Sequence, residues 1–401
     1  MIQNIEKFDL AIIGASLAGN YLCYLLSNTD LKIIVIEEHE EIGMPFQCAG
    51  IVSQKLSKLV NLPHEIILNQ VKTAKIIGPT GTYIKLSGNE KPYIIDRIAF
   101  DRLFYNKVKL NENILYLLGE KFKNFKYIKD AQQKYILVET SKRKIKVNML
   151  IGCDGPLSSV AGLLGIKNRN LFATQIRIEA QFDENEATMF FDKRWKELFG
   201  WIVPEGRKIY RIGLACSKNI AKNFQVFLKR ININSRQKID QQGGLIPYGL
   251  MNKLSFDNIL LLGDSACQVK ASTGGGIVML LIAAKYATSC VKKCFKYSKF
   301  SKKIIQKYYE NPCRSIIGRE LKIHYLIRSV LEKFTNDDFE KLLQIIKSAK
   351  IENKISLYGD MDFPKAILYQ LLKVPFVISF FFKFIMKNPK FILRILKILL
   401  N

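Results

Sequence analysis

The sequence is short of the residues that build metal sites and disulfide frameworks. Its 401 residues include three histidines and eight cysteines, and no two cysteines form a C-x-x-C pair. Because a structural zinc site needs thiolates or imidazoles at short spacing, we predict no metal. Residues 1–7 lead directly into a strand pattern and lack the basic and apolar regions of a signal peptide. We therefore expect a cytoplasmic protein whose cysteines are thiols.

Acidic residues are also scarce. The chain has 35 Asp and Glu against 62 Lys and Arg, which gives a formal net charge of +27. Such an excess suits a partner that carries phosphates, whether nucleic acid, an anionic membrane or a phosphorylated small molecule. No zinc knuckle, helix-turn-helix or aromatic RNA motif is present, so we predict no nucleic-acid partner. The apolar share of 48% is that of a folded chain, which excludes disorder as the main feature. The length of 401 residues suits two or three domains.

Long uncharged runs are few. The run from Leu10 to Thr29 is long enough to cross a bilayer, but Gly14, Ser16 and Gly19 mark it as a strand, a turn and a helix. The run at 374–382 is far shorter than the roughly 20 residues that a spanning helix needs. We predict no membrane-spanning helix.

The first informative motif is the glycine-bearing turn Gly14-Ala15-Ser16-Leu17-Ala18-Gly19. It lies between a predicted strand at 8–13 and a predicted helix at 17–26, and Glu37 follows the next strand, 33–36. In a dinucleotide fold the first glycine makes the tight turn, the helix N-terminus binds the pyrophosphate, and the acid accepts hydrogen bonds from the ribose. Ser16 replaces the usual middle glycine and leaves less room for a phosphate. The pattern favours a βαβ nucleotide-binding unit over a turn without a ligand.

A second glycine-rich segment follows a buried strand at 258–262. Gly263-Asp264 ends that strand, and residues 273–277 (TGGGI) open a long helix that continues through Cys294. Three successive glycines weaken a helix, so their presence suggests that a flat ligand approaches the backbone closely. The helix N-terminus would favour negative charge there, such as that on the N1–C2=O edge of a reduced isoalloxazine. A loop in which the glycines serve only to allow positive φ is an equal alternative for this segment. A third segment, residues 153–159, on its own predicts an ordinary turn.

Taken in this order, the motifs resemble the FAD-dependent oxidoreductases of the p-hydroxybenzoate hydroxylase type. Four segments narrow the resemblance to the geranylgeranyl reductase family, and the similarity spans about residues 8–330. The segments are residues 41–50 (EIGMPFQCAG), 96–101 (DRIAFD), 199–204 (FGWIVP) and 263–277 (GDSACQVKASTGGGI).

The resemblance implies an α/β fold with an α+β second domain. It comprises a Rossmann-like FAD-binding domain, a mostly antiparallel substrate-domain sheet and a C-terminal helical region. The expected divisions are 1–170 for the FAD-binding domain, with a hairpin at 71–95 contributing to the substrate domain, 171–252 for the substrate sheet, 253–300 for the rest of the FAD-binding domain, and 301–401 for a membrane- or lipid-facing helical region.

Local patterns predict further elements. We expect a helix at 97–108, three strands across 114–151, several strands across 172–216, and helices from residue 301 onward. The expected interruptions of that helical region lie near Pro312, Gly359, Pro364, Pro375 and Pro389.

The resemblance also implies which residues hold FAD. They are Gly14, Ser16, Ala18 and Gly19 at the pyrophosphate, Glu37 at the adenosine ribose, Arg97 at the phosphates, Asp264 at the ribityl or phosphate region, Gly275, Gly276 and Ile277 at the flavin ring edge, and Cys48 and Ala49 beside the isoalloxazine.

For the substrate, the family carries a Tyr-x-Trp-x-Phe-Pro motif. Trp201 and Pro204 match it, whereas Phe199 and Val203 replace its Tyr and Phe, so the lining stays apolar but a phenol is lost. We expect Phe199, Trp201 and Pro204 to contact the substrate.

No catalytic residue follows from the sequence with the same force. Cys48 is the candidate, and a small buried residue is the plain alternative. A redox bond between Cys48 and Cys313 is conceivable, although a reducing compartment argues against a permanent link. We expect His324 to be a packed or surface histidine rather than a base.

The C-terminal segment is basic and apolar. Residues 364–401 contain no Asp or Glu, and Phe, Ile and Leu alternate with seven basic residues: Lys365, Lys373, Lys383, Lys387, Lys390, Arg394 and Lys397. This pattern fits a helix lying in the headgroup region of an anionic bilayer, and we expect peripheral membrane association. The alternatives are a helix that caps a lipid-binding cavity and one that packs its apolar side on the protein.

The activity that the resemblance implies is FAD-dependent saturation of C=C bonds in the geranylgeranyl chains of archaeal membrane phospholipids. An isolated alkene offers no carbonyl to polarise, so the protein must supply mainly a dry apolar channel, which agrees with the absence of a recognisable dyad or triad. No second nucleotide fingerprint is present, so we expect a ferredoxin-like protein or another external reductant as electron donor. The alternatives are a flavin-dependent monooxygenase or halogenase on an aromatic or isoprenoid substrate, and a non-catalytic membrane-binding flavoprotein.

Overall fold

The computed structural model describes residues 5–129 and 134–389. Its larger sheet has eight strands, of which β17, β18, β11, β1, β2 and β8 lie in that order, while β10 and β9 extend from β11. The pairs of β1 with β11 and β2, of β2 with β8, and of β11 with β18 are parallel. The strand bounds are β1 Glu6–Ile13, β2 Ile33–Ile36, β8 Ile114–Leu117, β9 Phe122–Lys129, β10 Lys134–Thr140, β11 Lys144–Gly152, β17 Ser255–Phe256 and β18 Ile259–Leu261.

Helices cover this sheet closely. α1 (Leu17–Leu26) packs against α3 (Arg97–Val108) and α6 (Ile277–Lys296), and most of α1 is buried. The approach of α1 to the turn before it requires glycine, because a Cβ at Gly19 would collide with the carbonyl oxygen of Gly14.

The smaller sheet has seven strands in the order β16, β12, β15, β14, β13, β5 and β6. All neighbouring pairs are antiparallel except β13 with β5. α5 (Ile220–Arg230) covers one face, where Trp195 and Phe227 are fully buried. The bounds are β5 Thr73–Ile77, β6 Tyr83–Leu86, β12 Asn170–Glu179, β13 Glu186–Phe190, β14 Gly200–Gly206, β15 Ile209–Cys216 and β16 Lys238–Pro247.

Two local predictions need correction. Among the described residues, the segment 114–151 contains four strands rather than three, because β8 joins the parallel sheet while β9, β10 and β11 form an antiparallel meander. In the segment 71–95, β5 and β6 do form a hairpin, but β5 also pairs in parallel with β13. The end of that segment, β7 (Tyr93–Ile95), joins β3 (Ile51–Val52) and β4 (Ile67–Gln70) in a separate three-stranded sheet.

The region after residue 301 is helical, as predicted, but Pro312 does not interrupt it. α7 (Lys302–Ile305), α8 (Asn311–Cys313) and α9 (Arg319–Leu331) are joined by π-helical turns at 306–310 and 314–318. A proline lacks the N–H of a regular helical bond, and π-turns are one way in which a helix absorbs such a local defect.

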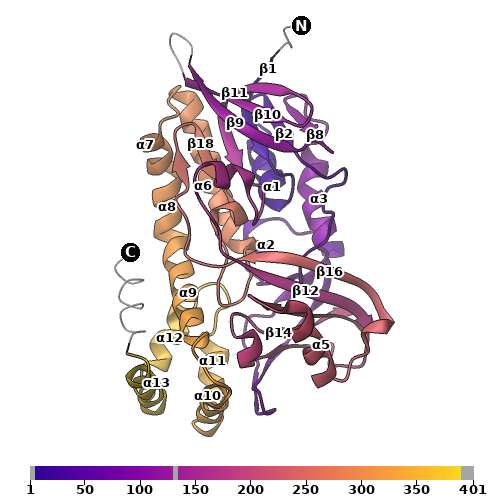
Figure 1. Cartoon of the computed structure of the whole chain (residues 1–401), viewed down its shortest axis with the longest axis vertical. Helices are drawn as coiled ribbons and strands as arrows, with labels where there is room; N and C mark the ends of the chain where they lie inside the picture. The colour runs from indigo at the N-terminus through magenta and orange to yellow at the C-terminus, as the bar shows by residue number, and fades with distance from the viewer. Residues whose placement is uncertain (1–4, 130–133, 390–401) are drawn as a thin grey trace.

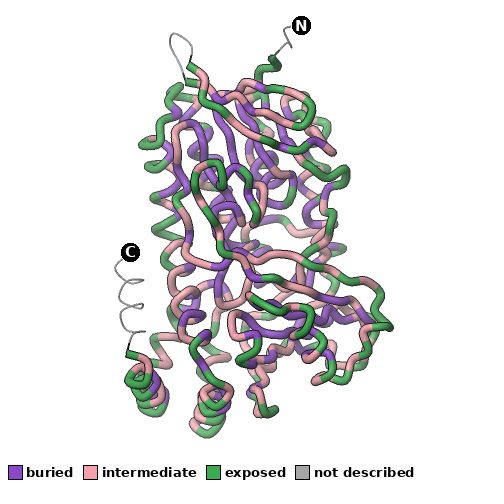
Figure 2. Tube along the Cα trace, viewed as in Figure 1, coloured by how far each residue is buried: buried purple, intermediate pink, exposed green. Residues whose placement is uncertain are grey.

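The later helices are short and gather at the end of the molecule opposite β1 (Figure 1). They are α10 (Asn336–Ser348), α11 (Glu352–Tyr358), α12 (Lys365–Leu371) and α13 (Pro375–Lys387), and Gly359, Pro364 and Pro375 stand at their ends or starts as predicted. Figure 2 shows much exposed surface on α10 and α13. Lys390, Arg394 and Lys397 of the basic C-terminal segment lie outside the described residues.

Within the described ranges, we find no single helix that is long and apolar enough to cross a membrane. α12 and α13 together have a suitable length and composition, but the two helices meet at an angle of 94°.

Candidate functional site

The turns that follow β1 and β18 lie side by side, where strands of the larger sheet end. Gly14, in the turn after β1, has φ 100°, and a Cβ there would overlap the carbonyl oxygen of Cys153 after β11. Gly263 follows β18, and a Cβ at that position would lie 3.2 Å from the Cβ of Ala18 in the first turn of α1. The carboxyl ends of parallel strands thus bring the two predicted glycine motifs together, at the edge where nucleotides bind in such sheets.

Glu37 lies directly against the first motif. Its Oε2 accepts a hydrogen bond from the N–H of Ala15 at 2.8 Å, and its Oε1 accepts one from the N–H of His39 at 2.9 Å. Nδ1 of His39 lies 2.6 Å from the same Oε1, and the side chain of Glu37 is 12% exposed. This placement suits an acid that accepts from ribose hydroxyls.

Arg97 and Ser16 are joined by a residue that sequence reasoning did not single out. Asp101 receives Nη2 of Arg97 on Oδ1 at 2.9 Å and the hydroxyl of Ser16 on Oδ2 at 2.9 Å. Asp101 is buried and stands four residues after Arg97 on α3, a spacing that places both side chains on one helix face. That spacing is the signal by which Asp101 could have been found.

The guanidinium of Arg97 keeps donor capacity. Burial would lower its pKa, but the charge of Asp101 outweighs burial and raises it, so the group is a permanent cation. Its Nε is buried and has no hydrogen-bond partner within the described ranges. A buried cation with an open N–H beside a helix N-terminus fits a phosphate group.

Asp264 stands in the turn after β18, next to Gly263. Burial raises its pKa to about 6, and Arg97 opposes this rise. Its Oδ1 would be 3.7 Å from a Cβ at Gly276, the residue that caps the N-terminus of α6 before Ile277. Together with Glu37 and Arg97, this set of an acid, a cation and glycine backbones fits the FAD that the sequence resemblance implies.

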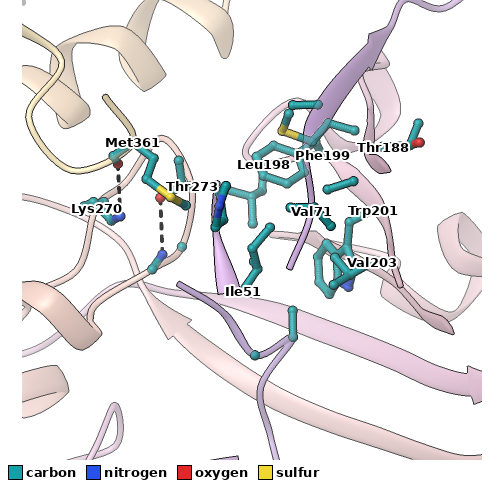
Figure 3. A pocket seen from close by; sticks show the side chains of 18 of the residues that line it. Ile51, Val71, Thr188, Leu198, Phe199, Trp201, Val203, Lys270, Thr273 and Met361 are labelled. Atoms are coloured by element: carbon teal, nitrogen blue, oxygen red, sulfur yellow. Dashed lines mark hydrogen bonds between the residues drawn. The ribbon is translucent and has the colours of Figure 1, made fainter. Parts of the chain in front are cut away.

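A cavity of about 510 Å³ lies over the smaller sheet (Figure 3). Predicted residues from both sets line it: Cys48, Ala49 and Gly275 from the cofactor set, and Phe199 and Trp201 from the substrate set. Most of the remaining wall is apolar and includes Ile51, Val71, Leu198, Val203 and Ile246.

Strand alternation explains which side chains of β14, and of Phe199 just before it, reach the cavity. Phe199, Trp201 and Val203 share one face and one hydrophobic cluster, whereas Ile202 packs with the opposite cluster. Side chains alternate along a strand, so Pro204 projects to the face of Ile202 and is not among the residues that line the cavity.

The loop that carries Cys48 is held by side chains from the smaller sheet. Gln175 donates to the carbonyl of Cys48 at 3.1 Å, and Arg211 donates to the carbonyl of Ala49 at 3.0 Å. Trp201 donates its indole N–H to Gln175 at 3.0 Å, so it also steadies this contact. Sequence reasoning missed Gln175 and Arg211, since the only signal was a polar side chain in an apolar strand.

The cysteines and His324 were the other side chains with possible chemical roles. All eight cysteines are free thiols; Cys48 is half-buried and Cys313 is buried. His324 is buried beside the glycine-rich segment 273–277. Its ring forms hydrogen bonds with the hydroxyl of Ser272 and the carbonyl of Asp362. Burial lowers its pKa to about 4.

No family model matches the chain. Curated relatives match over nearly its whole length. "Uncharacterized protein MJ1520" of Methanocaldococcus jannaschii is 27% identical over 92% of this chain and 96% of its own length. Digeranylgeranylglycerophospholipid reductase 1 of Methanococcoides burtonii is 26% identical over 92% of this chain and 92% of its own length. The predicted resemblance to geranylgeranyl reductases is confirmed.

Solved structures share the fold. A geranylgeranyl bacteriochlorophyll reductase-like protein of Thermoplasma acidophilum superposes with a TM-score of 0.81 at 21% identity, over 95% of this chain and 100% of that one. The p-nitrophenol 4-monooxygenase PnpA of Pseudomonas putida gives a TM-score of 0.68 at 13% identity, over 93% of this chain and 99% of that one. These likenesses confirm the predicted fold class.

The position of Glu37 predicts its effect on FAD binding. Replacing Glu37 with Ala should weaken FAD affinity about tenfold or more, because a hydrogen bond to a charged group is lost. Titration of the FAD-free protein with FAD measures this. Glu38→Ala is the matched control, since Glu38 pairs with Lys121 at the surface. Equal affinity of the Glu37→Ala variant and the wild type would contradict the assignment.

The raised pKa of Asp264 predicts a pH dependence of stability in the FAD-free protein. The unfolded carboxyl ionises near its ordinary value of 3.8 and the folded one near 6, so the wild type loses stability as the pH rises between these values. Asp264→Asn lacks this loss, so its stability advantage should grow between pH 4 and 6, by up to about 3 kcal/mol, and then level off. Denaturant unfolding across pH measures the difference; a pH-independent difference would show that Asp264 titrates normally.

Proposed function

We propose that this chain is an FAD-dependent reductase that saturates C=C bonds of geranylgeranyl chains in archaeal membrane phospholipids. The observation that carries the proposal is the junction between the two parts of the site. Cys48, Ala49 and Gly275, which the resemblance assigns to the FAD site, also line the apolar cavity. An apolar chain in the cavity would therefore lie beside the position expected for the flavin ring.

The contribution of the protein is mainly alignment and exclusion of water. Bound FAD in its reduced form supplies the hydride. Phe199, Trp201 and Val203 provide a flat apolar wall against which a prenyl chain can slide, and no polar substrate group is needed for this contact. Cys48 is the candidate to hold a proton at its Sγ, which accepts a hydrogen bond from the N–H of Gly50 at 3.2 Å.

The electrons must come from outside the chain. We propose a ferredoxin-like protein or another external reductant, because the nucleotide motifs of the sequence are those assigned to FAD. The high positive charge of +27 would favour an acidic electron-transfer partner.

A monooxygenase is the second candidate, since PnpA shares the fold. The names of the near full-length relatives favour the reductase. The two activities differ in whether reduced flavin meets an alkene or oxygen. The non-catalytic alternative predicts bound flavin without turnover.

Peripheral membrane association completes the proposal. Phe376, Phe382 and Met386 on α13 are each 64% or more exposed, as is Leu372 just before it. Lysines at 365, 373, 383 and 387 lie among these side chains, and the segment has no acid. Exposed apolar side chains between lysines suit an anionic bilayer surface.

The reductase proposal predicts hydrogen transfer to lipid without oxygen. The chemically reduced, FAD-loaded protein should reoxidise on anaerobic addition of unsaturated archaeal phospholipid, and the lipid should gain two hydrogen atoms per double bond. Flavin absorbance and mass spectrometry of the lipid measure the two sides. Reoxidation by oxygen alone, with a hydroxylated product, would establish the monooxygenase instead.

The membrane proposal predicts weaker binding to vesicles after loss of exposed aromatic side chains. The double variant Phe376→Ser/Phe382→Ser should pellet with anionic liposomes at least about tenfold less tightly, because each buried aromatic contributes about 1.5–3 kcal/mol. Leu110→Ser is the matched control, since Leu110 is 87% exposed on the connection between α3 and β8. Undiminished pelleting of the double variant would favour packing of the segment on the protein.

A further inference from the structure

The rim of the cavity is made by two segments that are distant in sequence. On one side lies the connection between β6 and β7, with Gly88, Glu90 and Pro92. On the other side lie the end of α11 and the loop after it, including Ser356 and Asp360. We call the line of contact between these two segments the seam. Because all five residues line the cavity, the seam leads directly to its interior.

The two sides approach each other closely along this seam. The N–H of Ser87 donates to the hydroxyl of Ser356 at 3.0 Å. A Cβ at Gly88 would lie 2.8 Å from the carbonyl oxygen of Ser356, so glycine permits the approach. The seam is therefore shut in this structure.

One side chain connects both sides of the rim. Nζ of Lys55 lies 3.2 Å from Oε1 of Glu90 and 2.9 Å from Oδ1 of Asp360. Lys55 is 28% exposed, which places this bridge near the surface, and both carboxylates belong to the cavity lining. Ion pairs near the surface are weak, so a bridge of this kind can open and reform during binding.

The helices beside the seam are apolar on both sides. Ile355 of α11 and Ile367 of α12 line the cavity. Leu357 on α11 and Tyr369 on α12 are each 61% exposed on the outside. An apolar chain that left a bilayer at this surface would thus find apolar contacts outside and inside the seam.

We infer that the seam between the β6–β7 connection and the α11–α12 loop is a portal through which a prenyl chain of a membrane lipid enters the cavity, and that Lys55 closes it. This inference rests on the proposed function. It specifies the face on which the lipid docks, namely the outer surface of α11 and α12, and the ion bridge that must separate for entry.

The portal can be tested by locking it. In a Glu90→Cys/Asp360→Cys variant, a short bifunctional thiol reagent joins the two sides, since both native carboxylates reach one Nζ. Trp201 lines the cavity and Trp195 is the second of two tryptophans, so a Trp195→Phe background isolates its fluorescence. Quenching of Trp201 by a brominated-chain phospholipid in anionic vesicles then reports entry without turnover.

We expect the lock to slow quenching about tenfold or more, and a thiol reductant should reverse the effect if the reagent carries a cleavable disulfide. The two single-cysteine variants, treated in the same way, control for reaction at native Cys48. In the opposite direction, Lys55→Met should quicken quenching a few-fold, because the bridge is absent. Unchanged quenching in the locked protein, or slower quenching in Lys55→Met, would overturn the inference.

The same samples separate this inference from the proposed function. If the unlocked protein takes up lipid and the lock stops uptake, but no lipid is reduced, the portal stands and the reductase proposal fails. If the locked protein reduces vesicle lipid at the unlocked rate, the reductase proposal stands and the portal is wrong.

Discussion

The close approach of α1 to the turn after β1 is the constraint on which the rest of the site depends. Only a glycine at position 19 lets the helix start against the carbonyl of Gly14, and only a glycine at 14 lets that turn pass Cys153. This packing brings the first turn of α1 to Gly263 after β18. Glu37 and Arg97 are then both held at that turn, Glu37 through Ala15 and Arg97 through Asp101 and Ser16.

The second condition is that the two sheets meet at the loop of Cys48. Gln175 and Arg211 project from the smaller sheet and bind backbone carbonyls of that loop, which itself leads into β3. The loop is therefore fixed to the smaller sheet by hydrogen bonds as well as by the packing of Ala49 and Ile51. A change in the smaller sheet would move this part of the cavity wall.

The sequence allowed accurate prediction wherever a local pattern decides the structure. The helices at 17–26 and 97–108 and the strand at 33–36 have the predicted bounds, because hydrophobic period and turn residues act over a few positions. The predicted interruption at Pro312 was wrong, because the π-turns on either side of it absorb the local effect of the proline.

Pairing between distant segments was beyond such patterns. No local pattern indicates that β7 pairs with β3 and β4, or that Asp101 accepts a hydrogen bond from Ser16, 85 positions away. The bridge of Lys55 to Asp360 spans 305 positions and has no sequence signature at all. Contacts of this kind depend on the tertiary arrangement of the whole chain.

Two buried cations hold the glycine-rich segment beside the cavity, and both are partnered by groups of the protein. Arg328 is fully buried on α9, and desolvation lowers its pKa to about 9. Its guanidinium donates to carbonyls of Ala271 and Ser272 in the glycine-rich loop and of Leu198 in the cavity wall. Lys270 is likewise buried and pairs with Asp362 at 2.6 Å. A buried cation is tolerated only when its donors are satisfied, so each of these side chains requires the loop to keep its position. The glycine-rich segment is thus fixed by buried hydrogen bonds and an ion pair.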